Sequence, residues 1–427
     1  MLISVLYILI LVSDILSQYI PTVGYLDEAV TFISLLGCVP LLLYGHEKER
    51  IMRRRALLFL LLLLIIGGLG TVLYEIQTST EGVLKDVLAV SKFFVIYVGM
   101  TELIDRVNTR YWRWIVIVTK TYIAILFMFC IVSFFVDLGM TSDTRFAGIP
   151  VYQFLYSHPT FLATIECVLV TVLLTDGFGR NKLFVIMGCL TLLMTFRTKA
   201  AVFLLAVILI PLVRAMLKGG YSNRRKSLLT AGILVAALAV VFGYDKINEY
   251  LAWGTTAARP ALYIRGLQVM VDFFPLGSGF CTFGSSLSGE YYSPLYYEYG
   301  MSSINGITPY EYNYIGDTFW PYIYAQFGIL GLLFYLFALN NVYRSIKAKI
   351  GDKWFSNYAL FCFGLYFLGS CFVEAVPTNS SCLAIAFCFV LIGYFGKVEE
   401  SCYERKPRID KTSIKKNSGN RISQADF

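Results

Sequence analysis

The sequence is poor in the residues that build most soluble active sites. Only 15% of its 427 residues are charged, and it contains just two histidines, His46 and His158. No pair of cysteines or histidines has the spacing of a metal-binding motif, so we expect no metal site and no cofactor. Of the ten cysteines, eight lie in apolar runs, Cys402 lies in the basic tail and only Cys281 lies in the predicted external loop, which argues against a disulfide framework.

A net charge of +8 could suggest a nucleic-acid partner, but the distribution of charge does not. The basic residues form short clusters between apolar runs, such as His46–Arg55, and a tail from Lys397 to Arg421. Under the positive-inside rule, such clusters mark the cytoplasmic loops of a membrane protein. We therefore expect these residues to face the membrane surface and its anionic headgroups, not nucleic acid.

Apolar side chains, in contrast, are abundant: 57% of the residues are hydrophobic and the mean hydropathy is +0.66. Apolar runs of about 20 residues, enough to cross roughly 30 Å of hydrocarbon, recur along the chain. Because backbone groups in lipid must bond within their own segment or a closed barrel, these runs predict helices. The expected fold class is an all-α, polytopic integral membrane protein with about twelve spans. The spans are predicted at residues 2–17, 28–44, 56–76, 83–104, 115–137, 152–175, 183–196, 200–217, 228–244, 318–339, 354–374 and 380–396.

The charge of the connecting segments divides the chain into four parts. Residues 1–244 hold the first nine predicted transmembrane helices, 245–317 form a large external loop, 318–396 hold the last three spans, and 397–427 form a basic cytoplasmic tail. This topology places both termini in the cytoplasm and leaves only seven basic residues outside. These seven are Lys85, Arg145, Arg197, Lys199, Lys246, Arg259 and Arg265.

The predicted external loop begins with an amphipathic helix over residues 255–274, ended by the segment 275–279 (PLGSG). A tyrosine-rich stretch follows. Tyrosine rings stack on sugar C–H faces, and tyrosine hydroxyls and carboxylates bond sugar hydroxyls, so we interpret Asp272, Tyr291 and Tyr310 as candidate glycan-binding residues. The alternative is an aromatic belt at the membrane interface.

The outward cations are the exceptions to the charge pattern. Arg197 and Lys199 lie in a minimal turn between two spans, with no acidic residue nearby in the sequence. The two cations repel each other, and an anionic ligand would reduce this repulsion. The alternative is that they reach lipid phosphates. Arg259 and Arg265 lie on the predicted loop helix, where a salt bridge to a loop carboxylate such as Asp272 is an alternative to ligand binding.

Lys92, Glu102 and Glu166 are charged residues placed at depth in predicted spans, where charge is costly. Lys92 and Glu166 are predicted to pair across the fourth and sixth spans. Glu102, near the cytoplasmic end of the fourth span, is predicted to be interfacial. His158, which precedes Pro159, is interpreted as a turn residue and not as a catalyst.

Three stretches together resemble the O-antigen polymerase and O-antigen ligase group of bacterial envelope proteins. Residues 191–205 (TLLMTFRTKAAVFLL) are similar to the family's apolar–Ser-Arg–small–apolar motif, with Phe196 here in place of serine. Residues 259–283 (RPALYIRGLQVMVDFFPLGSGFCTF) resemble its arginine-led loop helix followed by Pro-Leu-x-Gly-x-Gly. Residues 317–333 (DTFWPYIYAQFGILGLL) resemble the span after the loop. The order of these stretches around one long loop carries the resemblance.

The resemblance implies chemistry on lipid-linked glycans at the outer face of the bacterial plasma membrane. The expected function is polymerisation of oligosaccharide repeat units linked to undecaprenyl pyrophosphate, without a metal, into a capsule, exopolysaccharide or O-antigen chain. Arg197 and Arg259 are the candidate catalytic cations for the pyrophosphate, supported by Lys199 and Arg265, and Asp317 is the candidate group that orients or deprotonates the acceptor hydroxyl. The expected partners besides the lipid-linked glycan are a chain-length regulator and a flippase of the same pathway.

Two alternatives remain open from the sequence. The first is a ligase that moves a finished glycan onto a terminal acceptor. The ligases are expected to need a histidine just before the span that follows the loop, whereas Gly316 and Asp317 occupy that place here, which favours a polymerase. The second alternative is a flippase or transporter of the lipid-linked glycan. Transporters usually place their charges near the bilayer midplane, not beside an external loop.

Overall fold

The computed structural model describes residues 2–43, 47–107, 111–146, 148–218 and 254–404. The described chain is mostly helical, and six of its helices are long and apolar enough to cross a membrane, as expected for a multi-pass membrane protein. The six are η1 with α2, then α3, α4, α5, α6 and α13; α1 and α15 are shorter apolar helices. Each predicted span within the described residues overlaps a helix, although the span predicted from residue 152 corresponds to a helix that begins at Pro159; the predicted span 228–244 lies outside the described residues.

The described residues form helices and one pair of short strands. They are α1 (Leu2–Ser17), η1 (Pro21–Tyr25), α2 (Leu26–Leu43), α3 (Lys48–Tyr74), α4 (Thr80–Ile104), α5 (Tyr111–Ser133), β1 (Thr141–Phe146), β2 (Ile149–Tyr152), α6 (Pro159–Asp176), α7 (Phe178–Leu193), α8 (Thr198–Lys218), η2 (Gly254–Thr256), α10 (Ala258–Asp272), α11 (Ser286–Glu290), α12 (Leu295–Glu298), α13 (Phe319–Ile350), α14 (Trp354–Ser370) and α15 (Cys382–Glu404). The short antiparallel pair β1–β2 was not predicted and lies in the segment between α5 and α6.

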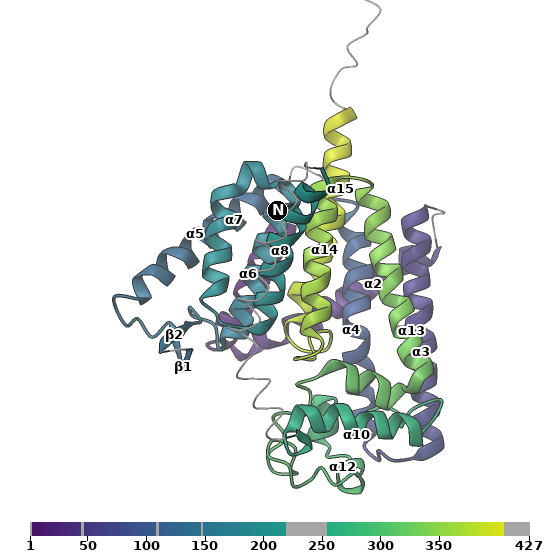
Figure 1. Ribbon diagram of the computed structural model, residues 1–427. Coiled ribbons are helices and arrows are strands. Elements are labelled where there is room, and N and C mark those ends of the chain that lie inside the picture. Colours follow the sequence, from purple (N-terminus) through teal and green to yellow (C-terminus); the bar gives the residue numbers. More distant parts are fainter. Residues whose placement is uncertain (1, 44–46, 108–110, 147, 219–253, 405–427) are drawn as a thin grey trace, which may run out of the picture.

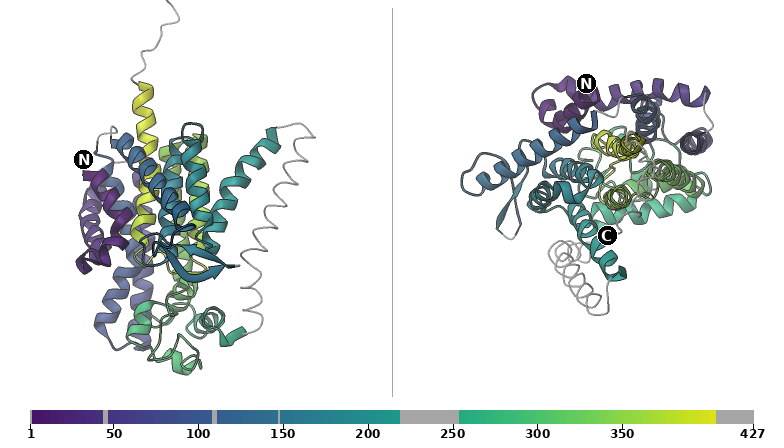
Figure 2. Two further views of the ribbon diagram at one scale, coloured as in Figure 1. Left: turned by 90° about the vertical axis from the view of Figure 1, so that its left-hand side faces the viewer. Right: turned by 90° about the horizontal axis from the view of Figure 1, so that it is seen from above.

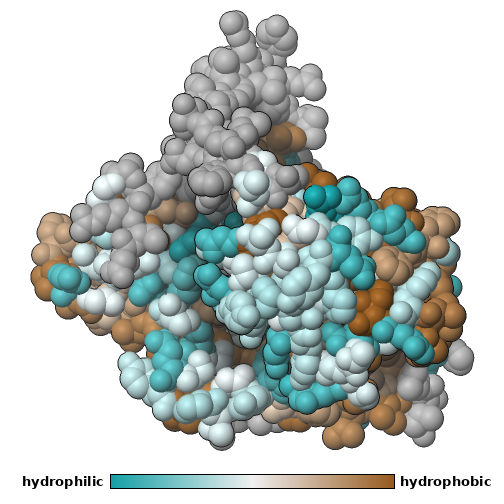
Figure 3. All heavy atoms as spheres, turned by 90° about the horizontal axis from the view of Figure 1, so that it is seen from below, coloured by the Kyte–Doolittle hydropathy of each residue, from teal (hydrophilic) through white to brown (hydrophobic). Residues whose placement is uncertain are grey.

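The long helices form one bundle, with the segment from η2 to α12 gathered at one end of it (Figure 1). We call residues 254–318 the loop segment and this end of the bundle the loop end. Helices α1 and α2 lie along one side of the bundle, whereas α4, α6 and α15 are largely buried within it (Figure 2). Seen from the loop end, hydrophilic residues cover the middle of the surface and hydrophobic residues gather towards its edges (Figure 3). That distribution fits a face in water surrounded by a perimeter in lipid.

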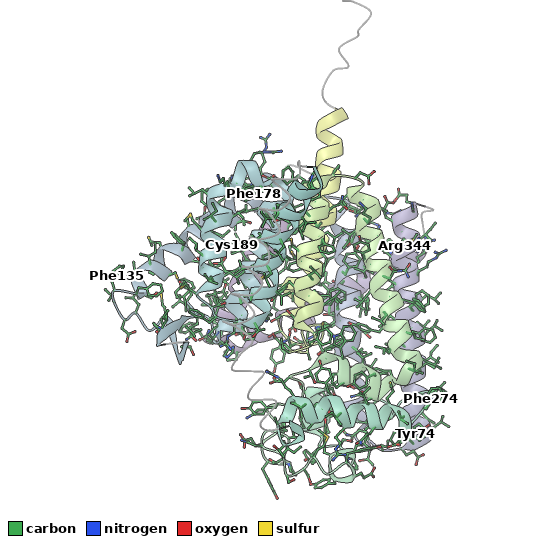
Figure 4. All side chains as sticks on the ribbon, viewed as in Figure 1. Tyr74, Phe135, Phe178, Cys189, Phe274 and Arg344 are labelled. Atoms are coloured by element: carbon green, nitrogen blue, oxygen red, sulfur yellow. The ribbon has the colours of Figure 1, made fainter. Side chains whose placement is uncertain are left out.

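The loop segment folds around a small hydrophobic core of its own. Ala261, Leu262 and Val269 form the buried face of α10, as the amphipathic pattern predicts. They pack against Phe283, Tyr296 and other buried side chains of the segment, and against Tyr324 and Ala325 of α13. The far end of α10 reaches the end of α3, where the rings of Tyr74 and Phe273 are in edge contact at 4.8 Å, near the labelled Tyr74 and Phe274 in Figure 4.

Two glycines allow the loop segment to dock on a break in α13. Gly328 has φ 61° and ψ −165°, a conformation essentially restricted to glycine, and it interrupts α13 after its first nine residues. Gly277 of the PLGSG turn approaches so closely that a Cβ there would lie 2.3 Å from the Gly328 nitrogen. The backbone of Ser278 and Gly279 then donates to the carbonyls of Ala325 and Gln326. The sequence had predicted a continuous span from residue 318, whereas the straight part of α13 begins after Gly328.

The ion pairs inside the bundle differ from those predicted. Lys92 donates to Asp27 at 2.6 Å and to Glu28 at 3.3 Å, so α4 is tied to α2 and the predicted Lys92–Glu166 pair is wrong. Glu166 is fully buried in α6, and neither of its carboxyl oxygens has a hydrogen-bond partner among the described residues. Sequence spacing could not find these pairs, because the partner of a buried charge depends on which helices are neighbours.

Glu102 is buried and not interfacial as predicted. Its carboxylate accepts from Arg53 at 2.7 Å and lies 3.3 Å from Arg50, and both Arg53 and Glu102 have side chains only 1% exposed. Arg53 lies about 30 Å along α3 from Tyr74, at the end of the bundle opposite the loop segment. Asp105, one turn after Glu102, lies 2.5 Å from Lys349 of α13. These contacts join α3, α4 and α13 at that end.

We expect Arg53→Met to lower the free energy of unfolding by about 3–5 kcal/mol, because it deprives a buried carboxylate of its main partner. Denaturation of the purified protein in detergent measures this change. The double replacement of Arg53 by Met and Glu102 by Leu removes both charges together and is expected to recover most of the loss. A double variant no more stable than Arg53→Met would contradict the explanation.

Candidate functional site

The structure brings four of the predicted site residues together at the loop end. Arg197 and Lys199 come from the α7–α8 turn, Arg259 from the first turn of α10, and Asp317 from the segment just before α13. These three places are separated by about 60 residues each along the chain, yet their charged groups act on one another. The site therefore lies where the loop segment meets the membrane helices.

Arg259 and Asp317 form an ion pair that joins the start of α10 to the end of the loop segment, just before α13. The Arg259 Nη2 atom donates to the Asp317 Oδ2 atom at 3.0 Å, and each side chain is 33% exposed. Burial raises the pKa of the Asp317 carboxyl, the Arg259 guanidinium opposes this shift, and the charge of Glu374 adds to it. A carboxyl with a raised pKa accepts a proton more readily than an ordinary aspartate, which suits a group that takes a proton from a hydroxyl.

Arg197 is held by the local geometry of the α7–α8 turn. Phe196 adopts φ 45°, a left-handed conformation that is rare for a bulky residue, and Arg197 follows it directly as α8 begins. The Arg197 Nη2 atom donates to His158 Nε2 at 3.3 Å, and its buried Nε has no hydrogen-bond partner among the described residues. Arg197 directly precedes the N-terminal end of α8.

Lys199 is more deeply buried than Arg197, and its ammonium group forms two hydrogen bonds. Its Nζ donates to Glu374 Oε2 at 2.5 Å and to Thr164 Oγ1 at 3.1 Å. The other Glu374 oxygen accepts from Asn379 at 2.6 Å. Glu374 lies just after α14, so Lys199 joins α8 to the α14–α15 connection.

The charges at this place do not balance. Arg197, Lys199 and Arg259 face the carboxylates of Asp317 and Glu374, which pair with Arg259 and Lys199 respectively. Burial lowers the pKa of Arg197, the Glu374 carboxylate opposes this shift, and the Arg259 guanidinium adds to it. No salt bridge of the described residues includes Arg197. A guanidinium with a free buried N–H beside a second guanidinium is an arrangement that an anionic group would stabilise.

His158 is the side chain that faces Arg197 from the start of α6. It directly precedes α6, whereas the predicted span had begun at residue 152, and its Nδ1 accepts from the Thr160 backbone at 3.3 Å. Burial lowers the pKa of His158, and the positive charge of Arg197 lowers it further. Both effects disfavour the protonated imidazolium beside Arg197.

The remaining predicted residues lie elsewhere on the loop segment. Arg265 donates to Gln268 at 2.9 Å, and Asp272 accepts from Tyr299 at 2.6 Å, so among the described residues the Arg265–Asp272 salt bridge considered from the sequence is not formed. Asp272 lies at the other end of α10 from Arg259, about 20 Å along the helix. Tyr291 accepts from Lys85 at 3.1 Å beside α4, and Tyr310 is 96% exposed.

The tyrosine-rich stretch is in part structural. Tyr296 is fully buried in the core of the loop segment, where its hydroxyl accepts from the Gly284 backbone and bonds Ser288. Tyr292 donates to the carbonyl of Ile307. The exposed tyrosines are Tyr297, Tyr310, Tyr312 and Tyr314. Glycan binding by the loop surface stays a prediction for this exposed set and for Tyr291.

Glu374 is the residue of the cluster that the sequence did not single out. Its place directly after an apolar run, on the side predicted to carry few charges, was the available signal. That signal is weak, because a carboxylate at the end of a span is common at the membrane interface.

The fold and the site together define a multi-pass helical membrane protein with clustered cations and carboxylates at one end of its helix bundle. Comparison of the chain with protein-family models and with curated proteins found no match. Its function therefore has to be inferred from the chemistry of this cluster.

Proposed function

We propose that the chain is a polysaccharide polymerase of the O-antigen polymerase type. It joins oligosaccharide repeat units linked to undecaprenyl pyrophosphate, at the outer face of the bacterial plasma membrane. The observation that carries the proposal is the meeting of Arg197 and Arg259 at the loop end, with Asp317 beside them. The three residues come from the three stretches that resemble that family.

The proposal includes a topology of twelve spans with the loop end outside and both termini in the cytoplasm. The distribution of basic residues supports it. The clusters Lys48–Arg55 and Lys347–Lys353 lie at the end of the bundle away from the loop segment, where positive charge is expected to be cytoplasmic. The C-terminal part of α15, in which the predicted tail begins at Lys397, also lies at that end (Figure 1).

The reaction transfers a glycan from a pyrophosphate to a hydroxyl. The bond between the anomeric carbon and the pyrophosphate oxygen breaks, a new bond forms to the acceptor oxygen, and the hydroxyl loses its proton. Undecaprenyl pyrophosphate leaves with its electron pair, so negative charge grows on the pyrophosphate in the transition state. Preorganised cations at that position are the main way in which a protein accelerates such a step.

Each residue of the cluster has a role in this proposal. Arg197 and Arg259 neutralise the pyrophosphate, because a guanidinium offers two parallel donors to phosphate oxygens. Lys199, bound to Glu374, adds positive potential and fixes the turn that carries Arg197. Asp317 accepts the hydroxyl proton once the pyrophosphate has drawn Arg259 towards itself, and its raised pKa suits that task.

The lipid-linked intermediates that accumulate after gene deletion test this function. A strain without the polymerase is expected to accumulate single repeats on the outer face, because flipping continues and joining stops. Single repeats retained on the inner face would indicate a flippase instead, and long lipid-linked chains would indicate a ligase. Complementation with the intact gene controls for effects on neighbouring genes.

A further inference from the structure

His158 lies between two hydrogen-bond donors at the edge of the cation cluster. Its Nδ1 atom is 3.3 Å from the backbone nitrogen of Thr160, and its Nε2 atom is 3.3 Å from the Arg197 Nη2 atom. Both of these neighbouring nitrogens carry hydrogen, and neither can accept a hydrogen bond. Each ring nitrogen of His158 therefore faces a donor.

The two contacts cannot both be hydrogen bonds at the same time. In a neutral imidazole one ring nitrogen carries the proton, and only the other has a lone pair that accepts. With the proton on Nδ1, the ring accepts from Arg197 but not from Thr160; with the proton on Nε2, it accepts from Thr160 but not from Arg197. A protonated ring accepts from neither. In each of these states the ring leaves at least one donor without an acceptor.

An anionic oxygen beside Nε2 would give each of these donors an acceptor. The proton then lies on Nε2, Nδ1 accepts from Thr160, and the oxygen accepts from both Nε2 and the Arg197 guanidinium. Charge-assisted hydrogen bonds are about 2.7–2.9 Å long, so one oxygen can lie at this distance from two nitrogens that are 3.3 Å apart. His158 is exposed and Arg197 is half-buried, so a ligand can reach both side chains.

The charges around the ring favour an anion at Nε2 over an anion at Nδ1. Nε2 faces the Arg197 guanidinium, which in turn lies near the guanidinium of Arg259. Nδ1 faces the first turn of α6, where it caps a Thr160 N–H that has no acceptor within the helix. A compact anion with several negative charges matches two neighbouring guanidinium groups, and a pyrophosphate is such an anion.

We infer that His158 is a third donor to the pyrophosphate, beside Arg197 and Arg259. Its neutral Nε2–H and the Arg197 guanidinium share one pyrophosphate oxygen, while Nδ1 remains bound to the Thr160 backbone. No proton is transferred, because the pyrophosphate leaves as an anion, so His158 is a binding residue and not an acid. The sequence had assigned it to the turn alone. The inference rests on the proposed function, which supplies a pyrophosphate at this place.

Asparagine and glutamine at position 158 separate ligand binding from helix capping. Asparagine is a preferred N-cap residue and keeps an acceptor for Thr160, but it has no group where Nε2 lies. Glutamine is longer by one carbon and places its amide N–H donor near that position, but it is not a preferred N-cap residue. The probe is inorganic pyrophosphate, and its affinity is measured on the full-length protein in phosphatidylcholine nanodiscs. At a pH of about 8 an imidazole whose pKa lies below 6.5 is neutral.

His158→Asn is expected to weaken pyrophosphate binding about 10- to 150-fold, the effect of losing one hydrogen bond to a charged group. Its thermal midpoint is expected to match that of the wild type, because the cap of α6 is kept. His158→Gln is expected to retain most of the affinity. A residue that only capped α6 would show the reverse order. Equal affinity of the wild type and His158→Asn would overturn the inference, as would no binding by the wild type at millimolar pyrophosphate.

A phospholipid headgroup carries the same kind of phosphate oxygen as the pyrophosphate. The titration is therefore repeated in nanodiscs that contain phosphatidylglycerol. Unchanged affinity for pyrophosphate supports the inference. Pyrophosphate binding that is lost in these nanodiscs would assign the contact to the lipid and overturn the inference.

The position of the ring proton gives a second readout, which a structural role would not change. His46 is the only other histidine of the chain, so ¹⁵N-histidine labelling of the His46→Gln protein gives the NMR signals of one ring. With pyrophosphate bound, Nε2 is expected to carry the proton and Nδ1 to carry none. A bound state with the proton on Nδ1 would contradict the inference.

The outcome is separable from that of the proposed function. Joining of repeats by the wild type, with pyrophosphate affinity and polymer unchanged in His158→Asn, would contradict the role of His158 and leave the function standing. Pyrophosphate binding that depends on His158, in a protein whose deletion leaves single repeats on the inner face, would support that role and contradict the polymerase. Loss of both pyrophosphate affinity and polymer in His158→Asn supports both.

Discussion

Replacement of Arg197 by alanine is expected to lower the polymerisation rate by about 10²–10³-fold, as removal of one preorganised donor to a developing oxyanion does. Its guanidinium has a buried Nε without a hydrogen-bond partner among the described residues and lies near Arg259. In the proposed reaction negative charge develops on the pyrophosphate, so the loss is expected to appear in the transition state. Cells with this variant are expected to accumulate single lipid-linked repeats at normal protein abundance.

The lysine variant tests the geometry of that contact. A guanidinium presents two parallel donors, whereas an ammonium is a point charge, so Arg197→Lys is expected to fail nearly as badly as Arg197→Ala. Arg344→Ala is the control, because Arg344 is an exposed arginine of α13 in the half of the bundle away from the loop segment (Figure 4). Polymer of wild-type length and amount from Arg197→Ala would remove this residue from the site.

Replacement of Gly328 by alanine is expected to detach the loop segment from α13. The left-handed conformation alone costs about 1–3 kcal/mol for a residue with a Cβ. The added carbon would also lie 2.3 Å from the Pro275 oxygen and 2.6 Å from the Gly277 nitrogen, and both of these are backbone atoms that cannot move aside alone. We expect the variant to be cleaved within residues 254–318 by a protease that leaves the wild type intact, and to lose polymerisation.

Gly364→Ala is the matched control for that prediction. Gly364 lies inside α14, and a Cβ there would meet nothing within 4 Å. Alanine in a helix interior is favoured over glycine by roughly 0.5–1 kcal/mol, so this variant is expected to be as stable as the wild type or more so. If Gly328→Ala matched Gly364→Ala in protease resistance and thermal midpoint, the close approach of Gly277 and Gly328 would not hold the loop segment.

The sequence by itself located the long apolar helices that the structure describes. Lipid forces each span to satisfy its own backbone hydrogen bonds and to present apolar side chains, so the helices can be read locally from apolar runs. The amphipathic pattern of residues 255–274 predicted α10, because an apolar helix face has to pack against a core. The predicted topology leaves few cations on the outer side, which made Arg197 and Arg259 candidate site residues.

Only the tertiary structure decided which charges meet. Lys92 binds Asp27 and not Glu166, and Arg53 lies against Glu102, because α2 and α3 are the neighbours of α4 at those levels. Glu374 joins the cluster because the α14–α15 connection lies beside the α7–α8 turn. Two buried charges can pair only if their helices are neighbours in the bundle. Helices whose apolar surfaces have similar composition could pack in many different arrangements. The spacing of residues along the sequence shows which side chains share one face of a helix. It does not show which other helix packs against that face.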